Sequence, residues 1–178
     1  MRLRSFETRH PEDFLETDMS LDQRAFRDAL GQFPTGVSII TASPDGYQPF
    51  GVTANSFASV SLDPPLVLWS LQKTSDTFAA FEAATHFAVN ILSLDQQAMS
   101  NQYAKKFEHD LEADHFRIGE TGTPIINDAV VSFECEKHVC HDGGDHLIMV
   151  GRVLAMTGIG ATTPLCFHAG KYRRLDCE

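Results

Sequence analysis

Residues 50–71 place two contrasting segments side by side, and this contrast constrains the fold more than any other part of the chain. The first segment, 50–61, is rich in glycine, hydroxyls and an amide, whereas 66–71 is a nearly unbroken apolar run that follows two prolines. The apolar run predicts a buried strand. Short side chains leave backbone N–H groups open, so the first segment predicts a surface for a flat heteroaromatic ring or a phosphate.

The rest of the chain predicts short strands that are joined by turns. Strands are expected within residues 33–42, 85–92, 130–137 and 147–156, with a short closing strand within 164–172 and turns at 43–46 and 143–144. This amounts to about six or seven strands without regular βαβ crossovers, and no GxGxxG motif follows a strand. The fold class expected is therefore mainly β with peripheral helices, in a β-barrel rather than a doubly wound sheet.

Three helix starts are expected from capping patterns. Ser20 to Gln23 form a capping box, and the helix that follows should end at Gly31 and lie over one end of the barrel. Residues 73–77 predict a second start, with Asp76 in its first turn, and 93–96 form another capping box that opens a helix through Tyr103.

Composition limits the classes of function. The chain of 178 residues has a formal net charge of −10, which argues against a nucleic-acid partner or an anionic membrane surface. Residues 1–19 are expected to be an N-terminal arm and residues 20–178 one domain. The absence of an apolar run of signal-peptide or membrane-span length, together with four cysteines that read as free thiols, predicts a cytoplasmic protein.

The histidines and cysteines at 135–146 form the obvious candidate for a metal site. Cys135 and His138 face opposite sides of a strand, and no second ligand pair follows at a familiar distance, so no metal is expected. A zinc-binding module remains as an alternative hypothesis. No Gly-x-Ser-x-Gly elbow is present, and no cysteine begins an electropositive helix, so nucleophilic catalysis is not favoured.

Five motifs occur in an order that identifies a family. They are Pro34-Thr35-Gly36-Val37, Gly51 to Phe57, Ser59 to Val67, Gly144-Asp145-His146 and Gly170-Lys171-Tyr172. Together they resemble the flavin reductase-like family, the short reductase components of two-component flavin-dependent monooxygenases. The resemblance implies an FMN-binding split β-barrel, a homodimer, and hydride transfer from NADH or NADPH to FMN or FAD. It also implies a separate monooxygenase component that receives the reduced flavin.

The resemblance also implies roles for particular residues. The isoalloxazine ring and ribityl chain would lie against Pro34, Thr35, Gly36, Val52, Thr53, Ala54, Asn55, Ser56 and Phe57. The phosphate would be held by Lys73, Thr74 and Ser75, which read equally well as a capped helix with a solvent lysine. His146 would position the nicotinamide or carry a proton, with Tyr172 as a second candidate. Tyr103 and Phe107, by default core or interface residues, join the flavin contacts.

Some features depart from the family or leave alternatives open. Residues 165–168 lack the aromatic residues and arginine that many members carry, which puts the dinucleotide contacts of that strand in doubt. A flavin-binding electron carrier on the same fold, without direct NAD(P)H turnover, is the competing hypothesis. The sequence does not distinguish FMN from FAD, NADH from NADPH, or a resident flavin from a diffusing one.

Overall fold

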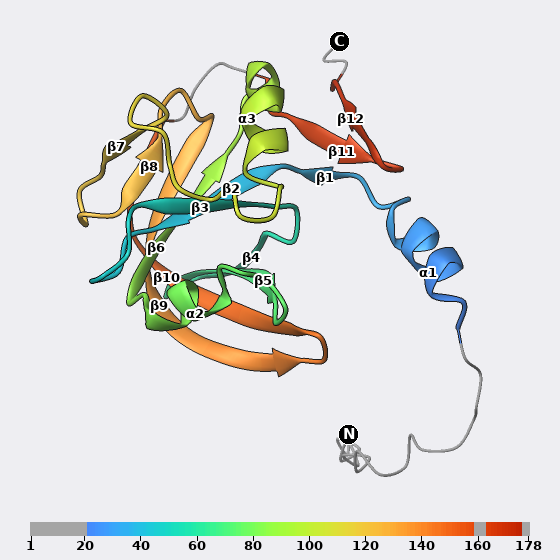
Figure 1. Ribbon diagram of the computed structural model, residues 1–178, viewed down its shortest axis with the longest axis horizontal. Coiled ribbons are helices and arrows are strands. Elements are labelled where there is room, and N and C mark those ends of the chain that lie inside the picture. Colours follow the sequence, from blue (N-terminus) through green and yellow to red (C-terminus); the bar gives the residue numbers. More distant parts are fainter. Residues whose placement is uncertain (1–20, 159–162, 176–178) are drawn as a thin grey trace, which may run out of the picture.

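The computed structural model describes residues 21–158 and 163–175. One antiparallel sheet of seven strands runs in the order β3-β2-β6-β9-β10-β5-β4. Its members are β2 (Ser38–Ala42), β3 (Phe50–Ala54), β4 (Ala58–Leu62), β5 (Pro65–Gln72), β6 (His86–Ile91), β9 (Val131–Gly143) and β10 (His146–Thr157). Figure 1 shows this sheet as strongly curled, with α2 beside the strand β9. The strand expected within 33–42 and the turn expected at 43–46 are confirmed: β2 and β3 form a hairpin, with Ile40 opposite Val52.

The curled sheet does not close on itself. Its two edges, β3 and β4, are consecutive in the chain, and only residues 55–57 join them. The expected split barrel with peripheral helices is therefore confirmed. Inside the curl lies an aromatic core in which the Trp69 and Phe81 rings meet edge to face at 4.9 Å between centroids, and Phe50 meets Phe81 at 4.7 Å.

Two small sheets accompany the large one. One combines β1 (Thr35–Gly36), β11 (Cys166–His168) and β12 (Lys171–Arg173), and the other pairs β7 (Phe116–Ile118) with β8 (Pro124–Ile126). The described residues thus contain twelve strands, more than the six or seven expected. The difference arises because strands of two or three residues show no periodicity of their own. The single closing strand expected within 164–172 is in fact a hairpin.

The first helix is placed differently from the expectation. Helix α1 (Gln23–Leu30) has Asp22 as its N-cap, with the carboxylate accepting from the Arg24 N–H at 2.9 Å, and it ends at Gly31 as predicted. Ser20, which begins the expected capping box, and the expected arm lie outside the described residues. Helix α1 buries no side chain and stands beside β11 and β12, away from the barrel (Figure 1), so the expectation that it covers a barrel end was wrong.

The other helices are short. Helix α2 (Phe78–Ala83) has Thr77 as its N-cap, so Asp76 precedes the helix and does not belong to its first turn. The capping box of Ser93 and Gln96 is confirmed and opens the 3-10 helix η2 (Leu94–Gln96), which continues as α3 (Gln97–Gln102). No helix in the described ranges is long and apolar enough to cross a membrane.

Candidate functional site

Strand β3 is the end strand of the large sheet, and its outer edge is covered by the segment at the end of α3 and after it. The Gly51 N–H donates to the His109 carbonyl at 2.8 Å, the Thr53 N–H donates to the Tyr103 carbonyl at 3.1 Å, and the Thr53 hydroxyl donates to the Ser100 carbonyl at 2.7 Å. These bonds protect an edge strand from pairing with another chain. The expectation that the small polar residues leave their donors open was therefore wrong for Gly51 and Thr53.

A cavity of about 340 Å³ lies beside this covered edge. Its walls come from β3, β5, the segment before α2, the segment after α3, and the start of β10. Of the residues expected at a flavin site, it brings together Val52, Thr53, Ala54, Asn55, Ser56, Thr74, Ser75 and His146. Since these residues come from three separate parts of the sequence, the structure unites most of the expected site in one place.

The cavity also contains residues that the sequence did not single out. They are Trp69, Ser70, Leu71, Gln72, Asp76, Ala104, Lys106 and His109. Trp69 was visible only as part of a buried strand, His109 lies in the acidic run 108–114 that reads as a solvated loop, and Ala104 and Lys106 lie just before that run. No sequence motif marks them, because they reach the cavity through the tertiary contact between this loop and β3.

Asp76 and His109 form a bridge in the cavity wall. His109 Nε2 lies 3.0 Å from Asp76 Oδ1, and the second carboxylate oxygen accepts the Phe107 N–H at 2.6 Å. Burial alone would raise the pKa of Asp76, but the Phe107 N–H and the charge of His109 outweigh it and lower that pKa. Both oxygens of this carboxylate therefore have partners within the protein.

The expected turn at Pro34-Thr35-Gly36 lies at a second cavity. This cavity, of about 730 Å³, is enclosed by α1, Phe33, Thr35 and the β11–β12 hairpin, and Asn55 lines it as well as the first one. Within the described part of the chain, the Thr35 hydroxyl is buried without a hydrogen-bond partner. Asn55 is thus the residue at which the two cavities meet.

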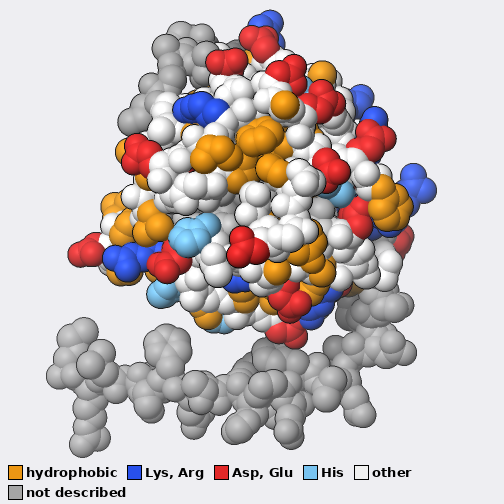
Figure 2. Space-filling view, turned by 60° about the vertical axis from the view of Figure 1, so that its left-hand side comes forward, with side chains coloured by type: hydrophobic (Ala, Val, Ile, Leu, Met, Phe, Trp, Pro, Cys, Tyr) orange, Lys and Arg blue, Asp and Glu red, His pale blue; other side chains and the backbone are white. Residues whose placement is uncertain are grey.

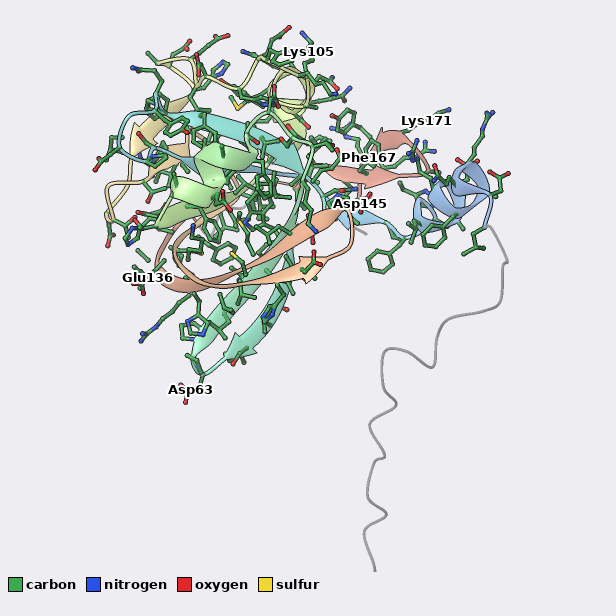
Figure 3. The ribbon with its side chains drawn as sticks, turned by 60° about the horizontal axis from the view of Figure 1, so that its bottom comes forward. Asp63, Lys105, Glu136, Asp145, Phe167 and Lys171 are labelled. Carbon is green, nitrogen blue, oxygen red and sulfur yellow. The ribbon has the colours of Figure 1, made fainter. Side chains whose placement is uncertain are left out.

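Lys73 points away from the first cavity. Its ammonium group pairs with the Asp142 carboxylate, and its backbone N–H donates to the Asp145 carbonyl at 2.9 Å. Asp142 and Asp145 lie at the tip of the β9–β10 hairpin, which Asp145 marks in Figure 3. The hydrogen bond from Lys73 lowers the pKa of Asp142. The structure therefore ties Lys73 to the hairpin that carries His146.

His146 borders the first cavity from this hairpin. Its Nδ1 lies 2.7 Å from Asp145 Oδ1, and this hydrogen bond lowers the pKa of the Asp145 carboxyl. Gly144 supplies the left-handed backbone, with φ of 76°, that the two-residue turn before β10 requires. The hydrogen bond from Nδ1 directs the other ring nitrogen away from Asp145.

The remaining expected residues lie elsewhere. Tyr103 is fully buried, and its hydroxyl lies 2.8 Å from His115 Nδ1, so it supports the wall from behind. Phe107 is 84% exposed and has a φ of 66°. The Tyr172 hydroxyl lies 2.9 Å from Ser100 Oγ. Phe57 stacks on Phe133 with 5.8 Å between ring centroids.

The histidine and cysteine cluster at 135–146 does not converge on one point. Cys135 is buried in β9, and burial raises the pKa of its thiol to about 12. Among residues 21–158 and 163–175, the possible ligands that lie within 4.8 Å of one another are those of Glu112, Asp114 and His115. That group shares no residue with the cluster, so the geometry does not support the zinc module.

The cavity suits a flavin in size and in chemistry. A volume of about 340 Å³ falls at the lower end of the range for small-molecule sites, and Asn55 lines both this cavity and the larger one. Apolar side chains from β3 and β5 suit a flat ring, and hydroxyls of Thr74 and Ser75 suit a phosphate. The buried Trp69 Nε1, which has no partner within the described residues, adds a donor beside the cavity.

The surrounding surface offers no broad attraction for anions. On the face drawn in Figure 2, Lys and Arg side chains are scattered among acidic ones. This agrees with the formal net charge of −10. A phosphate must therefore be held by groups within the cavity.

Comparison with known proteins agrees with these features. A family model described as "Flavin reductase like domain" matches residues 30–176. The chain is 46% identical over 156 residues to "FMN reductase (NADH) SmoA" of Agrobacterium fabrum, which covers 87% of each protein. It is 38% identical over 157 residues to "Flavin-dependent monooxygenase, reductase subunit HsaB" of Rhodococcus jostii, covering 88% of this chain and 80% of that protein.

A solved structure is also similar. The Streptomyces globisporus C-1027 NADH:FAD oxidoreductase SgcE6, in complex with NAD and FAD fragments, superimposes with a TM-score of 0.82 at 36% identity. The match covers 88% of this chain and 96% of that one. The similarity therefore extends over nearly the whole chain.

Proposed function

The chain belongs to the flavin reductase-like family, and on that premise we propose that it is an NADH-dependent flavin reductase. It transfers a hydride from NADH to FMN or FAD and supplies the reduced flavin to a separate monooxygenase. The observation that carries this proposal is the single cavity that unites Val52 to Ser56, Thr74, Ser75 and His146. The names of the Agrobacterium and Rhodococcus relatives support NADH as donor and a monooxygenase as recipient.

The chemistry of the reaction belongs to the cofactor, and the protein positions the reactants. A bound flavin supplies the hydride acceptor. The residues Val52 to Ser56 would form one wall for it, and Thr74 and Ser75 would hold its phosphate. The turn of Pro34, Thr35 and Gly36 would contribute through Thr35, whose unpartnered hydroxyl supports this role.

His146 has the role of a positioning residue for the nicotinamide. It borders the cavity from the β9–β10 hairpin, and its hydrogen bond to Asp145 restrains the orientation of the ring. Hydride transfer requires that nicotinamide C4 and flavin N5 lie close together in a suitable orientation. The first step requires no acid or base from the protein. His146 therefore acts through the placement of NADH.

We also propose that the protein forms a homodimer. Several large apolar side chains on or beside α1 are exposed in the single chain: Leu21 by 67%, Phe26 by 51%, Leu30 by 60% and Phe33 by 75%. An amphipathic helix with no buried residue needs a partner surface to cover its apolar face. Light scattering on the purified protein tests this, and a monomer at micromolar concentration would contradict it.

The compartment that we propose is the cytoplasm. Cys135, Cys140 and Cys166 are free thiols, which suits a reducing environment. NADH, the proposed hydride donor, is also available there. A reporter fusion that reads out export of the chain tests the assignment.

Steady-state oxidation of NADH with added FMN or FAD tests the proposed activity. The expected result is turnover that requires both the nicotinamide and the flavin. No turnover with either flavin and either nicotinamide would overturn the proposal. A yellow FMN that stays bound through gel filtration, together with little NADH oxidation, would instead support an electron carrier on the same fold.

A further inference from the structure

The charged residues around the cavity differ in how far their charges are cancelled. Asp76 faces His109, and His146 faces Asp145, each within hydrogen-bond distance. Lys106 also lines the cavity, and none of the ion pairs within residues 21–158 and 163–175 includes it. Lys106 therefore brings to the cavity a positive charge that has no ion-pair partner among the described residues.

The neighbouring lysines are used in other contacts. The ammonium group of Lys73 pairs with Asp142 at the hairpin tip, and Lys73 does not line the cavity. The ammonium group of Lys105 lies 3.0 Å from Glu108 Oε2 on the outer surface. Figure 3 shows Lys105 at the outer edge of the molecule, away from Asp145 and the hairpin tip.

Lys106 and the hydroxyls of Thr74 and Ser75 border the same cavity from two different segments. The segment that carries Lys106 is fixed on both sides: Phe107 N–H donates to Asp76 at 2.6 Å, and the Tyr103 carbonyl accepts from Thr53 N–H at 3.1 Å. A cation on a fixed segment, in one cavity with the hydroxyl-bearing residues Thr74 and Ser75, forms a small site for a phosphate monoester or diester.

Building on the proposed function, we infer that Lys106 supplies the cation for the flavin phosphate, whereas Lys73 positions the hairpin that carries His146. The Asp76 carboxylate would repel a phosphate in this cavity if it were free. Its two oxygens are occupied by Phe107 N–H and His109, so the repulsion is reduced. We therefore assign to Lys106 the phosphate-binding role that was expected for Lys73 from its position before α2.

Titration of the full-length protein with FMN and with riboflavin, followed by flavin fluorescence, tests the inference without any turnover. Riboflavin has the same ring and ribityl chain but lacks the phosphate. Lys106→Met is expected to weaken FMN binding about tenfold, as loss of a charge-assisted hydrogen bond does, and to leave riboflavin binding unchanged. Lys106→Arg keeps the charge and should retain most of the affinity for FMN.

Two further variants serve as matched controls. Lys105→Met removes the adjacent charge outside the cavity and should leave both affinities unchanged. Lys73→Met should raise the KM for NADH while leaving the preference for FMN over riboflavin intact. If Lys73→Met loses the preference for FMN over riboflavin and Lys106→Met keeps it, the inference is overturned and Lys73 is the residue that binds the phosphate.

The titration also separates this inference from the proposed function. If the wild-type protein binds FMN and riboflavin equally, the phosphate subsite is wrong while flavin reduction stands. If it binds neither flavin, the proposed function falls and the inference falls with it. Circular dichroism of each variant establishes that a loss of affinity does not reflect a loss of fold.

Discussion

His109 and Asp76 are joined so that both nitrogens of the imidazole ring face oxygen acceptors. Nε2 lies 3.0 Å from Asp76 Oδ1, and Nδ1 lies 3.2 Å from the Gly51 carbonyl oxygen. His109 therefore links the segment before α2 to β3 and occupies one oxygen of the Asp76 carboxylate beside the cavity.

Replacement of His109 by Gln should weaken FMN binding about fivefold, because the Asp76 carboxylate then loses the imidazole ring that faces it and repels the flavin phosphate more strongly. The double variant with Asp76→Asn should recover most of the lost affinity, since the repelling charge is gone. Fluorescence titration with FMN measures both. A double variant that binds FMN no better than His109→Gln would show that the pair acts through the shape of the wall.

Much of the fold could be predicted from local patterns. The hairpin of β2 and β3, the strand β6, the capping box at Ser93 and the helix end at Gly31 all follow from residues close together in the sequence. The position of α1 could not be predicted from the sequence, because an amphipathic pattern shows which face of a helix is apolar but not which part of the protein covers that face. The strands of two or three residues were missed for lack of periodicity.

The candidate site, too, could be predicted only in part from the sequence. Val52 to Ser56, Thr74, Ser75 and His146 were expected and do meet in one cavity. Lys106 and His109 were missed, because their relation to β3 depends on hydrogen bonds between segments about fifty residues apart. Lys73 was expected at the phosphate, but its partner Asp142 lies on a hairpin that local sequence does not bring near it.

His146→Ala should raise the KM for NADH about tenfold while changing the FMN dissociation constant less than twofold. The imidazole ring lies at the hairpin side of the cavity, so its loss affects the nicotinamide more than the flavin wall. Initial rates at varied NADH, together with an FMN titration, measure the two effects. The exposed His141 of the same hairpin, changed to Ala, is the control and should alter neither. An equal loss of both affinities would move His146 into the flavin pocket.

Gly51 serves the packing of the core rather than ligand access. A Cβ at this position would lie 2.9 Å from Ile39 Cγ2 and 3.1 Å from Leu111 Cδ2. Gly51→Ala should therefore lower the free energy of unfolding by about 1–3 kcal/mol, as overpacking of a core does. A Cβ at Gly36 meets nothing within 4 Å, so Gly36→Ala should leave the melting temperature nearly unchanged. Equal melting temperatures of the two variants would contradict this assignment.

Glu134 is a buried carboxylate that fixes the turn between β7 and β8. It is 0% exposed, and its oxygens accept the Glu120 N–H at 3.0 Å, the Thr121 N–H at 2.7 Å and the Thr121 hydroxyl at 2.6 Å. Burial would raise the pKa of Glu134, but the bonds from Thr121 and Glu120 and the charge of Arg117 outweigh burial and lower it. The ionised form is therefore the one that the folded protein stabilises.

A lowered pKa in the folded state ties stability to pH with a definite sign. Below the unfolded pKa, about 4.3 for a glutamate, the unfolded chain binds more protons at this site than the folded one, so stability falls as the pH falls further. At pH 7 the contribution is complete, and Glu134→Gln should cost about 2 kcal/mol because an amide cannot accept all three donors. The difference between wild type and variant should shrink steadily from pH 5 to pH 3, measured by urea unfolding. A difference that stays constant over this range would mean that folding does not change the pKa of Glu134, and a difference that grows as the pH falls would mean that Glu134 is protonated in the folded protein.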